Sequence, residues 1–540
     1  MNNSLTQPVV FQPAVARGLQ RGINQIANAV RPTLGASPRF VAFDRGLPGS
    51  VPEFLDDAGL IARRITELAD RDADVGAMLI RHVLWRQHEQ FGDGTATAAL
   101  LMQAVFNRGA CYVAAGGDAM RLRHVLTRGV ELAIAELQTM IVLPSQPEQL
   151  AQIAETICGD PPLAHLLGEI FEIIGADGDL EIRSGHGREL ERAYVEGSLW
   201  ESTILSRYML TEQYGTRCEL EHPAILLSDF DVRDPQELVP ALEQALRADL
   251  RTLVVVAHSM SDAALGLLLA QPADRMRIIA VKFSAGTTNE AAVLEDLARL
   301  TGGQPLLQAA GDSLRMLTPQ HFGRAQRAWA DSARFGIVAG AGDPRVLRTH
   351  IAALRACHRQ SDDIETRRAI QKRIATLTGG TAILTVGGWS EQEIAQRKAR
   401  ATRASGVLRM VLDSGVLPGG GAALLGCRPA LRRQLASTID VDERAAYQIL
   451  IEALEVPART LICNADYAVA TTMAAIDHAG AGYSLDTNSG EIAAMANIGI
   501  LDGAAAQVGA LRGAVTSAAL ALTIDICVHP AHRSQALMQP

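Results

Sequence analysis

Lysine is almost absent from this sequence. Its 540 residues include 50 lysines and arginines together, yet only Lys282, Lys372 and Lys398 are lysines. A phosphate-binding P-loop needs a lysine directly after a glycine, and none of the three follows one. A nucleotide site of the P-loop class is therefore excluded. The formal net charge of −9 argues against a nucleic-acid partner as well.

Closely spaced metal-binding and disulfide patterns are also missing. The seven cysteines lie far apart without a Cys-x-x-Cys pair, and the thirteen histidines include no His-Glu-x-x-His. We therefore expect buried thiols in a reducing compartment rather than disulfides, zinc or a protease-type metal site. No apolar run reaches the length of a membrane span and no signal peptide is evident. We expect a cytoplasmic protein without a membrane partner.

Aromatic residues are scarce at 4%, whereas 48% of the residues are hydrophobic. Cores must then be built from alanine, leucine, isoleucine and valine, which favours a helix-rich protein of several domains. Between two helical parts of the chain, short β-rich runs alternate with amphipathic helices. Helices are expected at residues 14–32, 60–90, 95–138, 235–247 and 262–270, and strands at 224–227, 252–256 and 278–281. Helical texture returns at 345–378 and 391–413 and dominates 421–523. This pattern predicts a multidomain α+β fold with an inserted α/β module.

The most informative motif is Gly92-Asp93-Gly94-Thr95-Ala96-Thr97, which leads into an apolar, alanine-rich helix. The free N–H groups and the positive dipole end of a helix N-terminus suit a phosphate. Asp93 could hold Mg²⁺ between its carboxylate and that phosphate. A helix start capped by Asp or Thr, without any ligand, would use the same residue types. A second glycine-rich loop precedes another helix at residues 415–421.

Both loops, with further short motifs in the same order, resemble the group I, bacterial-type 60 kDa chaperonin family. The further motifs are residues 21–30, 33–35, 113–117, 300–303 and 499–502. The likeness extends from about residue 14 to residue 530 and is that of a divergent, chaperonin-like paralogue. It implies a mainly helical equatorial nucleotide-binding domain at 1–137 and 414–540. It also implies a small intermediate domain at 138–196 and 381–413, and an inserted α/β apical substrate-binding domain at 197–380.

The resemblance implies ATP and Mg²⁺ as cofactors, and it leaves open K⁺. Carried over position by position, the expected nucleotide-binding residues are Thr33, Leu34, Gly35, Asp93, Gly94, Thr95, Thr97, Gly420 and Asp502, with Asp93 as the metal ligand. Asp57 matches an active-site aspartate. The residue before it is Asp56 where the family has lysine, so we expect repulsion of phosphates unless a cation offsets it.

The largest departure from the family is Arg403, which stands where the resemblance places a water-orienting aspartate. Attack on the γ-phosphate needs a carboxylate or amide to orient and deprotonate water. Arginine cannot act as a base at neutral pH, although it could pair with the phosphate. We therefore expect bound nucleotide but slow or absent hydrolysis, with any residual activity depending on Asp57. A local misalignment would remove this expectation.

The resemblance also places a client-binding face on the apical domain. The expected residues are Ile204, Tyr208, Met209, Val239, Leu242, Leu265 and Leu269. An apolar stripe at helical spacing would equally suit a core. Gly197 and Gly380 border the apical domain and are expected to act as hinges, although ordinary loop glycines would look alike.

Three functions stay open at this stage. The first is a conventional ATP-hydrolysing folding chaperonin. The second is a chaperonin-like chaperone or dedicated assembly factor that binds non-native or partly assembled protein with little turnover, and Arg403 favours it. The third is a non-catalytic ring subunit, which the retained Gly92–Thr95 turn disfavours. A homo-oligomeric ring is implied in each case; a lid co-chaperonin and rings mixed with an ordinary chaperonin stay open.

Overall fold

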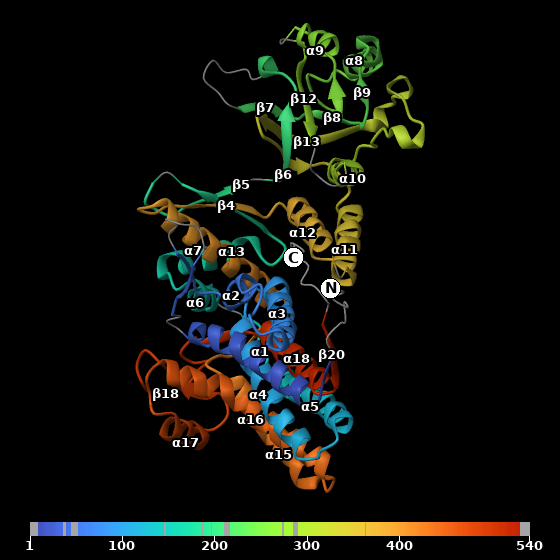
Figure 1. Cartoon of the computed structure of the whole chain (residues 1–540). Coiled ribbons are helices and arrows are strands. Elements are labelled where there is room, and N and C mark those ends of the chain that lie inside the picture. The colour runs from blue at the N-terminus through green and yellow to red at the C-terminus, as the bar shows by residue number, and fades with distance from the viewer. Residues whose placement is uncertain are drawn as a thin grey trace. The chain divides into compact units, whose positions relative to one another are not determined.

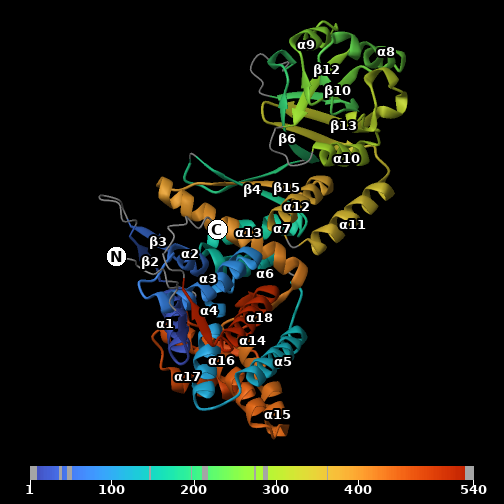
Figure 2. The ribbon, with the colours of Figure 1, turned by 45° about the vertical axis from the view of Figure 1, so that its right-hand side comes forward.

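The computed structural model describes residues 9–35, 39–44, 52–144, 147–185, 187–195, 197–209, 217–272, 275–283, 290–361 and 363–529. The chain divides into two compact units (Figures 1 and 2). The helical unit comprises residues 1–172 and 396–540, and the sheet unit comprises residues 173–395. The sheet unit is thus inserted between two halves of the helical unit, as expected. The predicted division into three domains is finer than this and stays a prediction.

The helical unit is built from antiparallel and crossing helices. They are α1 (Ala14–Val30), α2 (Ala58–Arg64), α3 (Arg71–Phe91), α4 (Thr95–Ala114), α5 (Ala119–Thr139), α6 (Pro147–Cys158), α14 (Ala422–Gly426), α15 (Arg428–Ser437), α16 (Val441–Asn464), α17 (Val469–Ala479) and α18 (Ala504–Ala521). Two more, α7 (Pro161–Ile174) and α13 (Glu391–Ser414), continue across the sequence boundary between the units.

Four of the expected helical stretches are divided. Residues 345–378 form two helices, and residues 421–523 form five helices and three short strands. The stretch 60–90 forms α2 and α3, because the Asp70 carboxylate accepts from the N–H groups of Asp72 and Ala73 and so begins a new helix. The stretch 95–138 forms α4 and α5, and Asp118 caps α5 in the same way. Hydrophobic periodicity alone does not show such breaks, because the apolar pattern resumes within a few residues.

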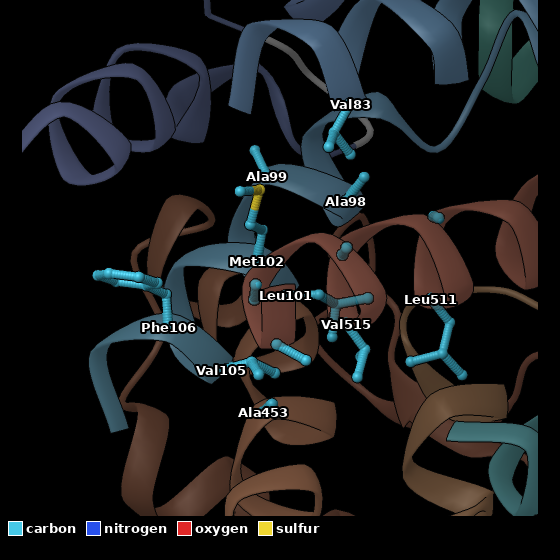
Figure 3. Close-up of a cluster of buried hydrophobic side chains, with 14 of the residues drawn as sticks. Val83, Ala98, Ala99, Leu101, Met102, Val105, Phe106, Ala453, Leu511 and Val515 are labelled. Carbon is cyan, nitrogen blue, oxygen red and sulfur yellow. The ribbon is translucent and has the colours of Figure 1, made fainter. Parts of the chain in front are cut away.

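The core of the helical unit surrounds α4. This helix packs against α1, α3, α16 and α18, and its apolar side chains are buried on almost every side (Figure 3). Small residues let the neighbouring helices approach closely. At Gly109, for example, a Cβ would lie 2.3 Å from Cδ1 of Leu522, which follows α18. The alanine-rich sequence of α4 therefore makes it a central helix rather than a surface one.

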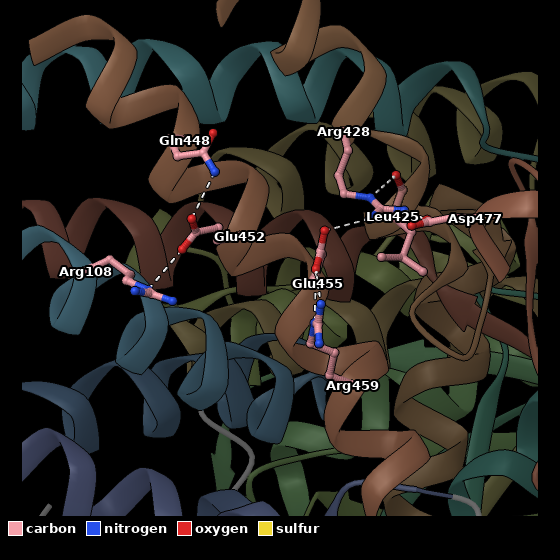
Figure 4. A network of polar contacts seen from close by, with 8 residues as sticks. All are labelled: Arg108, Leu425, Arg428, Gln448, Glu452, Glu455, Arg459 and Asp477. Carbon is pink, nitrogen blue, oxygen red and sulfur yellow. Dashed lines mark hydrogen bonds and ion pairs between the residues drawn. The ribbon is translucent and has the colours of Figure 1, made fainter. Parts of the chain in front are cut away.

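A buried polar network ties α16 to its neighbours (Figure 4). The side chain of Arg428, which is 6% exposed, pairs with Glu455 at 2.8 Å and with Asp477. Glu455 also pairs with Arg459 at 2.9 Å. A buried charge of this kind is tolerated only when it is paired, so the network fixes α15 and α17 against α16.

Short antiparallel ribbons complete the helical unit. Their strands are β1 (Val9–Phe11) with β20 (Ile526–Val528), β2 (Val41–Phe43) with β3 (Glu53–Leu55), β16 (Val416–Pro418) with β19 (Leu501–Gly503), and β17 (Tyr483–Leu485) with β18 (Ile492–Ala494). The first ribbon joins the two ends of the described chain, and the third leads into the predicted nucleotide site.

The sheet unit contains a seven-stranded mixed sheet in the order β14-β6-β12-β10-β8-β13-β7. Its strands are β6 (Ser198–Ile204), β7 (Arg217–Glu221), β8 (Ala224–Leu227), β10 (Thr252–Val256), β12 (Arg277–Phe283), β13 (Phe322–Asp331) and β14 (Arg334–Gly340). The three expected strands are confirmed as β8, β10 and β12. They are parallel: Val254 pairs with Ile225 on one side and with Ile279 on the other.

The sheet unit also contains helices and two smaller sheets. The helices are α8 (Val239–Arg247), α9 (Asp262–Leu269), α10 (Glu290–Thr301), α11 (Pro344–Gln360) and α12 (Ile364–Thr378). A three-stranded sheet in the order β4-β15-β5 contains β4 (Asp179–Ser184), β15 (Thr381–Val386) and β5 (Glu191–Val195), and β9 (Asp231–Val232) pairs with β11 (Ser259–Met260). Strands alternating with helices are confirmed for this unit.

All seven cysteines lie within the described ranges and are free thiols. Cys158, Cys218 and Cys427 are buried, whereas Cys111, Cys357 and Cys463 are exposed. The expectation of buried thiols is therefore wrong for those three exposed residues, which lie on outward faces of their helices. Of the helices within the described ranges, none combines the length and the hydropathy needed to cross a membrane.

Candidate nucleotide site

The Gly92-Asp93-Gly94 turn joins α3 to α4 and is held by hydrogen bonds. Gly92 (φ +67°) and Gly94 (φ +75°) both have left-handed backbone, which favours glycine. Near the end of α3, Gln87 Nε2 donates to the carbonyls of Asp93 (2.8 Å) and Ala506 (2.9 Å). The N-terminus of α4 is thereby fixed to the start of α18. Sequence reasoning missed Gln87, because nothing in its local pattern marks it.

The first turn of α4 follows directly. Its N-cap residue is Gly94, and no side chain accepts a hydrogen bond there. The alternative that Asp or Thr caps this helix is therefore wrong. Thr95 and Thr97 lie in the first turn and are each 5% exposed. The first N–H groups of a helix lack partners within it, and the helix dipole favours an anion at this end.

The predicted phosphate loop, residues 33–35, begins at the last residue of a short 3₁₀ turn after α1, η1 (Arg31–Thr33). Asn464, at the end of α16, donates from Nδ2 to the carbonyls of Arg31 (3.0 Å) and Leu34 (2.8 Å). Gly35 has φ +139°. The turn packs against α4, so the loop and the glycine turn border the same helix.

Gly420 and Asp502, the predicted adenosine end, lie on adjoining segments because β16 pairs with β19. The hydroxyl of Ser484 donates to the carbonyl of Gly420 at 2.7 Å. Gln507 Nε2 donates to Asp502 Oδ2 at 2.9 Å. Burial, and then the charge of Asp93, raises the pKa of Asp502 to about 7. The fold thus brings Asp93 and Asp502 together from distant parts of the chain.

Asp57 and Arg403 form an ion pair in the same region. Arg403 Nη1 donates to Asp57 Oδ2 and its Nη2 donates to the carbonyl of Ile157, both at 3.0 Å. Asp57 also caps α2, accepting the N–H of Leu60 on Oδ1 at 2.8 Å. His88 Nδ1 lies 3.1 Å from the same oxygen. Burial acts to raise the pKa of Asp57, but His88 and Arg403 outweigh it and lower the pKa to about 2.

The Arg403 side chain lies beside the glycine turn. A Cβ on Gly92 would lie 3.8 Å from Cγ of Arg403. Burial raises the pKa of Asp93, and the charge of Arg403 opposes that rise. The residue expected to change the chemistry of the site therefore lies next to the predicted phosphate-binding turn.

Three arginines on α13 pair with three aspartates of the helical unit. The pairs are Arg397 with Asp160 (2.7 Å), Arg400 with Asp56 (2.8 Å) and Arg403 with Asp57 (3.0 Å). Asp56 was expected to repel phosphates unless a cation offset its charge, and Arg400 is that cation. The sequence carried no local signal for these pairs, because hundreds of residues separate the partners of each.

The predicted client-binding residues divide into two groups in the sheet unit. Four belong to its core: Ile204, Met209, Leu242 and Leu265 are 4–9% exposed. For these four the expectation of an exposed apolar face is wrong in this structure, because their side chains belong to the hydrophobic core of the sheet unit. Three are exposed: Tyr208 at 87%, Val239 at 39% and Leu269 at 39%. Leu246, two turns after Val239 on α8, is exposed as well and was missed.

The two predicted hinge segments lie side by side within the sheet unit. Gly197 has φ +82°, and Gly379, rather than Gly380, has the second left-handed backbone at φ +72°. A Cβ on Gly379 would lie 3.7 Å from the carbonyl group of Gly197. Motion about these glycines stays a prediction.

Comparison with known proteins identifies the family to which this chain belongs. The TCP-1/cpn60 chaperonin family matches residues 26–531. This chain belongs to that family.

Solved structures agree on the fold. The chaperonin gp146 from the bacteriophage EL 2 (Pseudomonas aeruginosa), crystallised in the presence of ATP-BeFx, is similar to this chain in two crystal forms. Form I has a TM-score of 0.69 and 20% identity, covering 96% of this chain and 98% of that one. Form II has a TM-score of 0.62 and 19% identity, covering 97% and 99%. At this identity the likeness establishes the fold alone.

Proposed function

We propose that this chain is a chaperonin-like chaperone that binds non-native or partly assembled protein under the control of ATP and hydrolyses ATP slowly or not at all. The observation that supports weak hydrolysis is the Arg403–Asp57 pair at the glycine turn. Arginine cannot deprotonate water at neutral pH. Asp57 has a pKa of about 2 and is therefore a weak base.

The proposed ATP site is the space bordered by the start of α4, the loop 33–35 and the β16–β19 ribbon. The N-terminus of α4 would receive the phosphates, with the hydroxyls of Thr95 and Thr97 in its first turn. Gly420 and Asp502 would lie at the adenosine end. Glycine at position 420 supports this assignment, because its backbone is left-handed (φ +63°) and its lack of a side chain lets a ligand approach.

Steady-state ATP hydrolysis by the wild type and by Arg403→Asp, with nucleotide binding measured in parallel, tests the proposal. We expect the wild type to bind ATP and barely turn it over, and Arg403→Asp to turn over faster. Wild-type hydrolysis at an ordinary chaperonin rate would instead indicate a conventional folding chaperonin. Failure of both proteins to bind nucleotide would leave a non-catalytic ring subunit or a dedicated assembly factor.

Client binding is proposed for the exposed apolar residues of the sheet unit. Val239 and Leu246 share one face of α8, and α8 and α9 lie at the same end of the seven-stranded sheet in both views (Figures 1 and 2). Exposed apolar side chains so grouped suit a partner that itself exposes apolar surface, as a non-native chain does. Nucleotide-driven motion about Gly197 and Gly380 would alter access to them.

Ring assembly is proposed from the β1–β20 ribbon. Val9 pairs with Val528 and Phe11 with Ile526, so these four side chains share one face of the ribbon. All four are 45–59% exposed. Among the described residues this ribbon has two strands, and an apolar ribbon of this kind is a template for another strand. A second copy could add one, and repetition of a head-to-tail contact closes a ring. Native mass spectrometry of Phe11→Asp should show smaller assemblies than the wild type.

A further inference from the structure

A cavity of about 360 Å³ lies in the sheet unit, beside the β4-β15-β5 sheet. It is lined by residues 173–177, by Tyr194 on β5 and by residues 378–381. These segments are tied together, because the N–H of Asp179 on β4 donates to the carbonyl of Gly380 at 2.7 Å and α12 packs against β4. The volume falls in the range of small-molecule sites. The lining shares no residue with the candidate nucleotide site.

Two helices end at this cavity. The last residue of α7, Ile174, and the last residue of α12, Thr378, both line it. The last carbonyl groups of a helix lack partners within it, and the helix dipole is negative at this end. A basic side chain in the last turn often offsets that charge, but neither α7 nor α12, both fully described, has one there. In α7 the last turn instead contains an acid, Glu172. Two negative helix ends therefore meet at the cavity without a basic residue of their own.

The side chains of the lining add to this negative character. Asp177 is the one charged residue among the ten that line the cavity, all of which lie in the described ranges. Its Oδ2 accepts from Nη2 of Arg355 on α11, and a carboxylate can accept further hydrogen bonds. Tyr194 is 41% exposed, and the face of an aromatic ring is negative. Ile173, which is 64% exposed, supplies apolar surface. The cavity thus combines negative charge with aromatic and aliphatic surface.

We propose that this cavity binds an organic cation, namely an ammonium group on an aliphatic chain. The helix ends and Asp177 would attract the charge, and the ring face of Tyr194 would contact the ammonium group. Ile173 would cover the aliphatic chain. A free amine and the lysine side chain of a partner protein share this chemistry. Since Gly379 lines the cavity and lies beside Gly197, the cation would occupy the predicted hinge segment.

A ligand-observed NMR titration of the full-length, nucleotide-free chain with n-pentylammonium tests the proposal. The amine should bind saturably, whereas 1-pentanol, which has the same shape without the charge, should bind at least about tenfold more weakly. The amine should also slow amide hydrogen exchange in residues 173–177 and 378–381, which locates the site. Absence of saturable binding, or equal binding of the alcohol, would overturn the proposal.

The source of the cation is decided by a second titration with Nα-acetyl-lysine methylamide. Tighter binding of this lysine derivative than of n-pentylammonium would indicate the side chain of a partner protein. Equal or weaker binding would indicate a free amine. Either result keeps the chemistry of the site, because both ligands carry an ammonium group on an aliphatic chain.

Substitutions in the lining test which groups hold the cation. Ile173→Lys would place a covalently attached ammonium group at the end of α7 and should abolish binding of n-pentylammonium. Ile439→Lys, at an isoleucine of the helical unit that is 93% exposed, is the matched control and should bind as the wild type does. Tyr194→Leu should weaken binding by about three- to thirtyfold, and Tyr194→Phe, which keeps the ring, by less than about threefold. Tyr194→Leu serves if Ile173→Lys does not fold. Unchanged binding in Ile173→Lys and Tyr194→Leu would refute the proposed site.

Discussion

Asp93 and Asp502 lie close enough for the charge of one to affect the ionisation of the other. Asp93 follows α3 and Asp502 lies on β19, and the fold brings them together at the start of α4 and α18. Burial and this neighbouring charge raise the pKa of Asp502 to about 7. The site therefore contains a carboxyl group that is partly protonated near neutral pH.

Replacing Asp502 by asparagine should stabilise the protein at alkaline pH. The pKa of Asp502 is raised from 3.8 to about 7, so the folded state binds more protons than the unfolded state between these values. The free energy of unfolding then falls as pH rises from about 4 to 7, by roughly 1 kcal/mol per pH unit. Urea unfolding should show that the free energy of unfolding of Asp502→Asn, relative to that of the wild type, is higher at pH 8 than at pH 5.

The matched control for this experiment is Asp486→Asn. Backbone N–H groups, with that of Asn488 first, and the hydroxyl of Ser489 lower the pKa of Asp486. Its replacement should therefore reduce stability at pH 8, which is the opposite sign. Equal behaviour of the two variants across this pH range would show that Asp502 is not the group responsible.

The Asp57–Arg403 pair should stabilise the fold above pH 4 and lose that effect in acid. The pKa of Asp57 falls from 3.8 to about 2, so its contribution is complete above the unfolded value and disappears as pH falls through the folded one. Asp57→Asn should lower the free energy of unfolding by about 2 kcal/mol at pH 7. A double-mutant cycle with Arg403→Gln should give a coupling of about 1–3 kcal/mol. Additive effects of the two substitutions would contradict a direct interaction.

Local sequence signals predicted the features that depend on local backbone. Gly92 and Gly94 mark a turn because both need left-handed backbone, and the alternation of strands and helices around Val254 marks an α/β module. Gln87 and the Arg400–Asp56 pair escaped prediction, since their partners come from other elements of the fold.

The direction in which an apolar side chain points also escaped prediction. On α8, both Val239 and Leu242 belong to an apolar pattern, yet one is 39% exposed and the other 6%. Periodicity identifies a stripe but not which part of a wide stripe faces the sheet. That choice depends on how the helix packs, which no single sequence shows.

Gly94→Ala should both destabilise the helical unit and weaken nucleotide binding. Residue 94 has φ +75°, and a Cβ would lie 3.0 Å from Gln87 Nε2 and 3.2 Å from the carbonyl oxygen of Ala506. Left-handed backbone at an alanine costs roughly 1–2 kcal/mol. Displacement of the Gln87 side chain would also break the hydrogen bond that holds the turn. Gly116→Ala is the matched control, because it has φ +102° but nothing within 4 Å. Gly116→Ala should lower the free energy of unfolding in urea by the backbone strain alone and should leave nucleotide binding unchanged. Equal loss of nucleotide binding in Gly94→Ala and Gly116→Ala would mean that the contacts of the Gly92–Gly94 turn are irrelevant to binding.

Val239 and Leu242 should separate client binding from core stability, because they are three residues apart on one helix. Leu242→Ala removes a buried side chain from the core of the sheet unit and should cost about 2–5 kcal/mol in unfolding free energy. Val239→Ser changes an exposed side chain and should leave stability within about 0.5 kcal/mol. If the outer face of α8 binds clients, Val239→Ser with Leu246→Ser should reduce the capture of a denatured test protein, measured by suppression of its aggregation. If the double variant still fully suppresses aggregation of the test protein, client binding lies elsewhere. Both exposed apolar side chains of that face would then be gone while the core beneath them stayed intact.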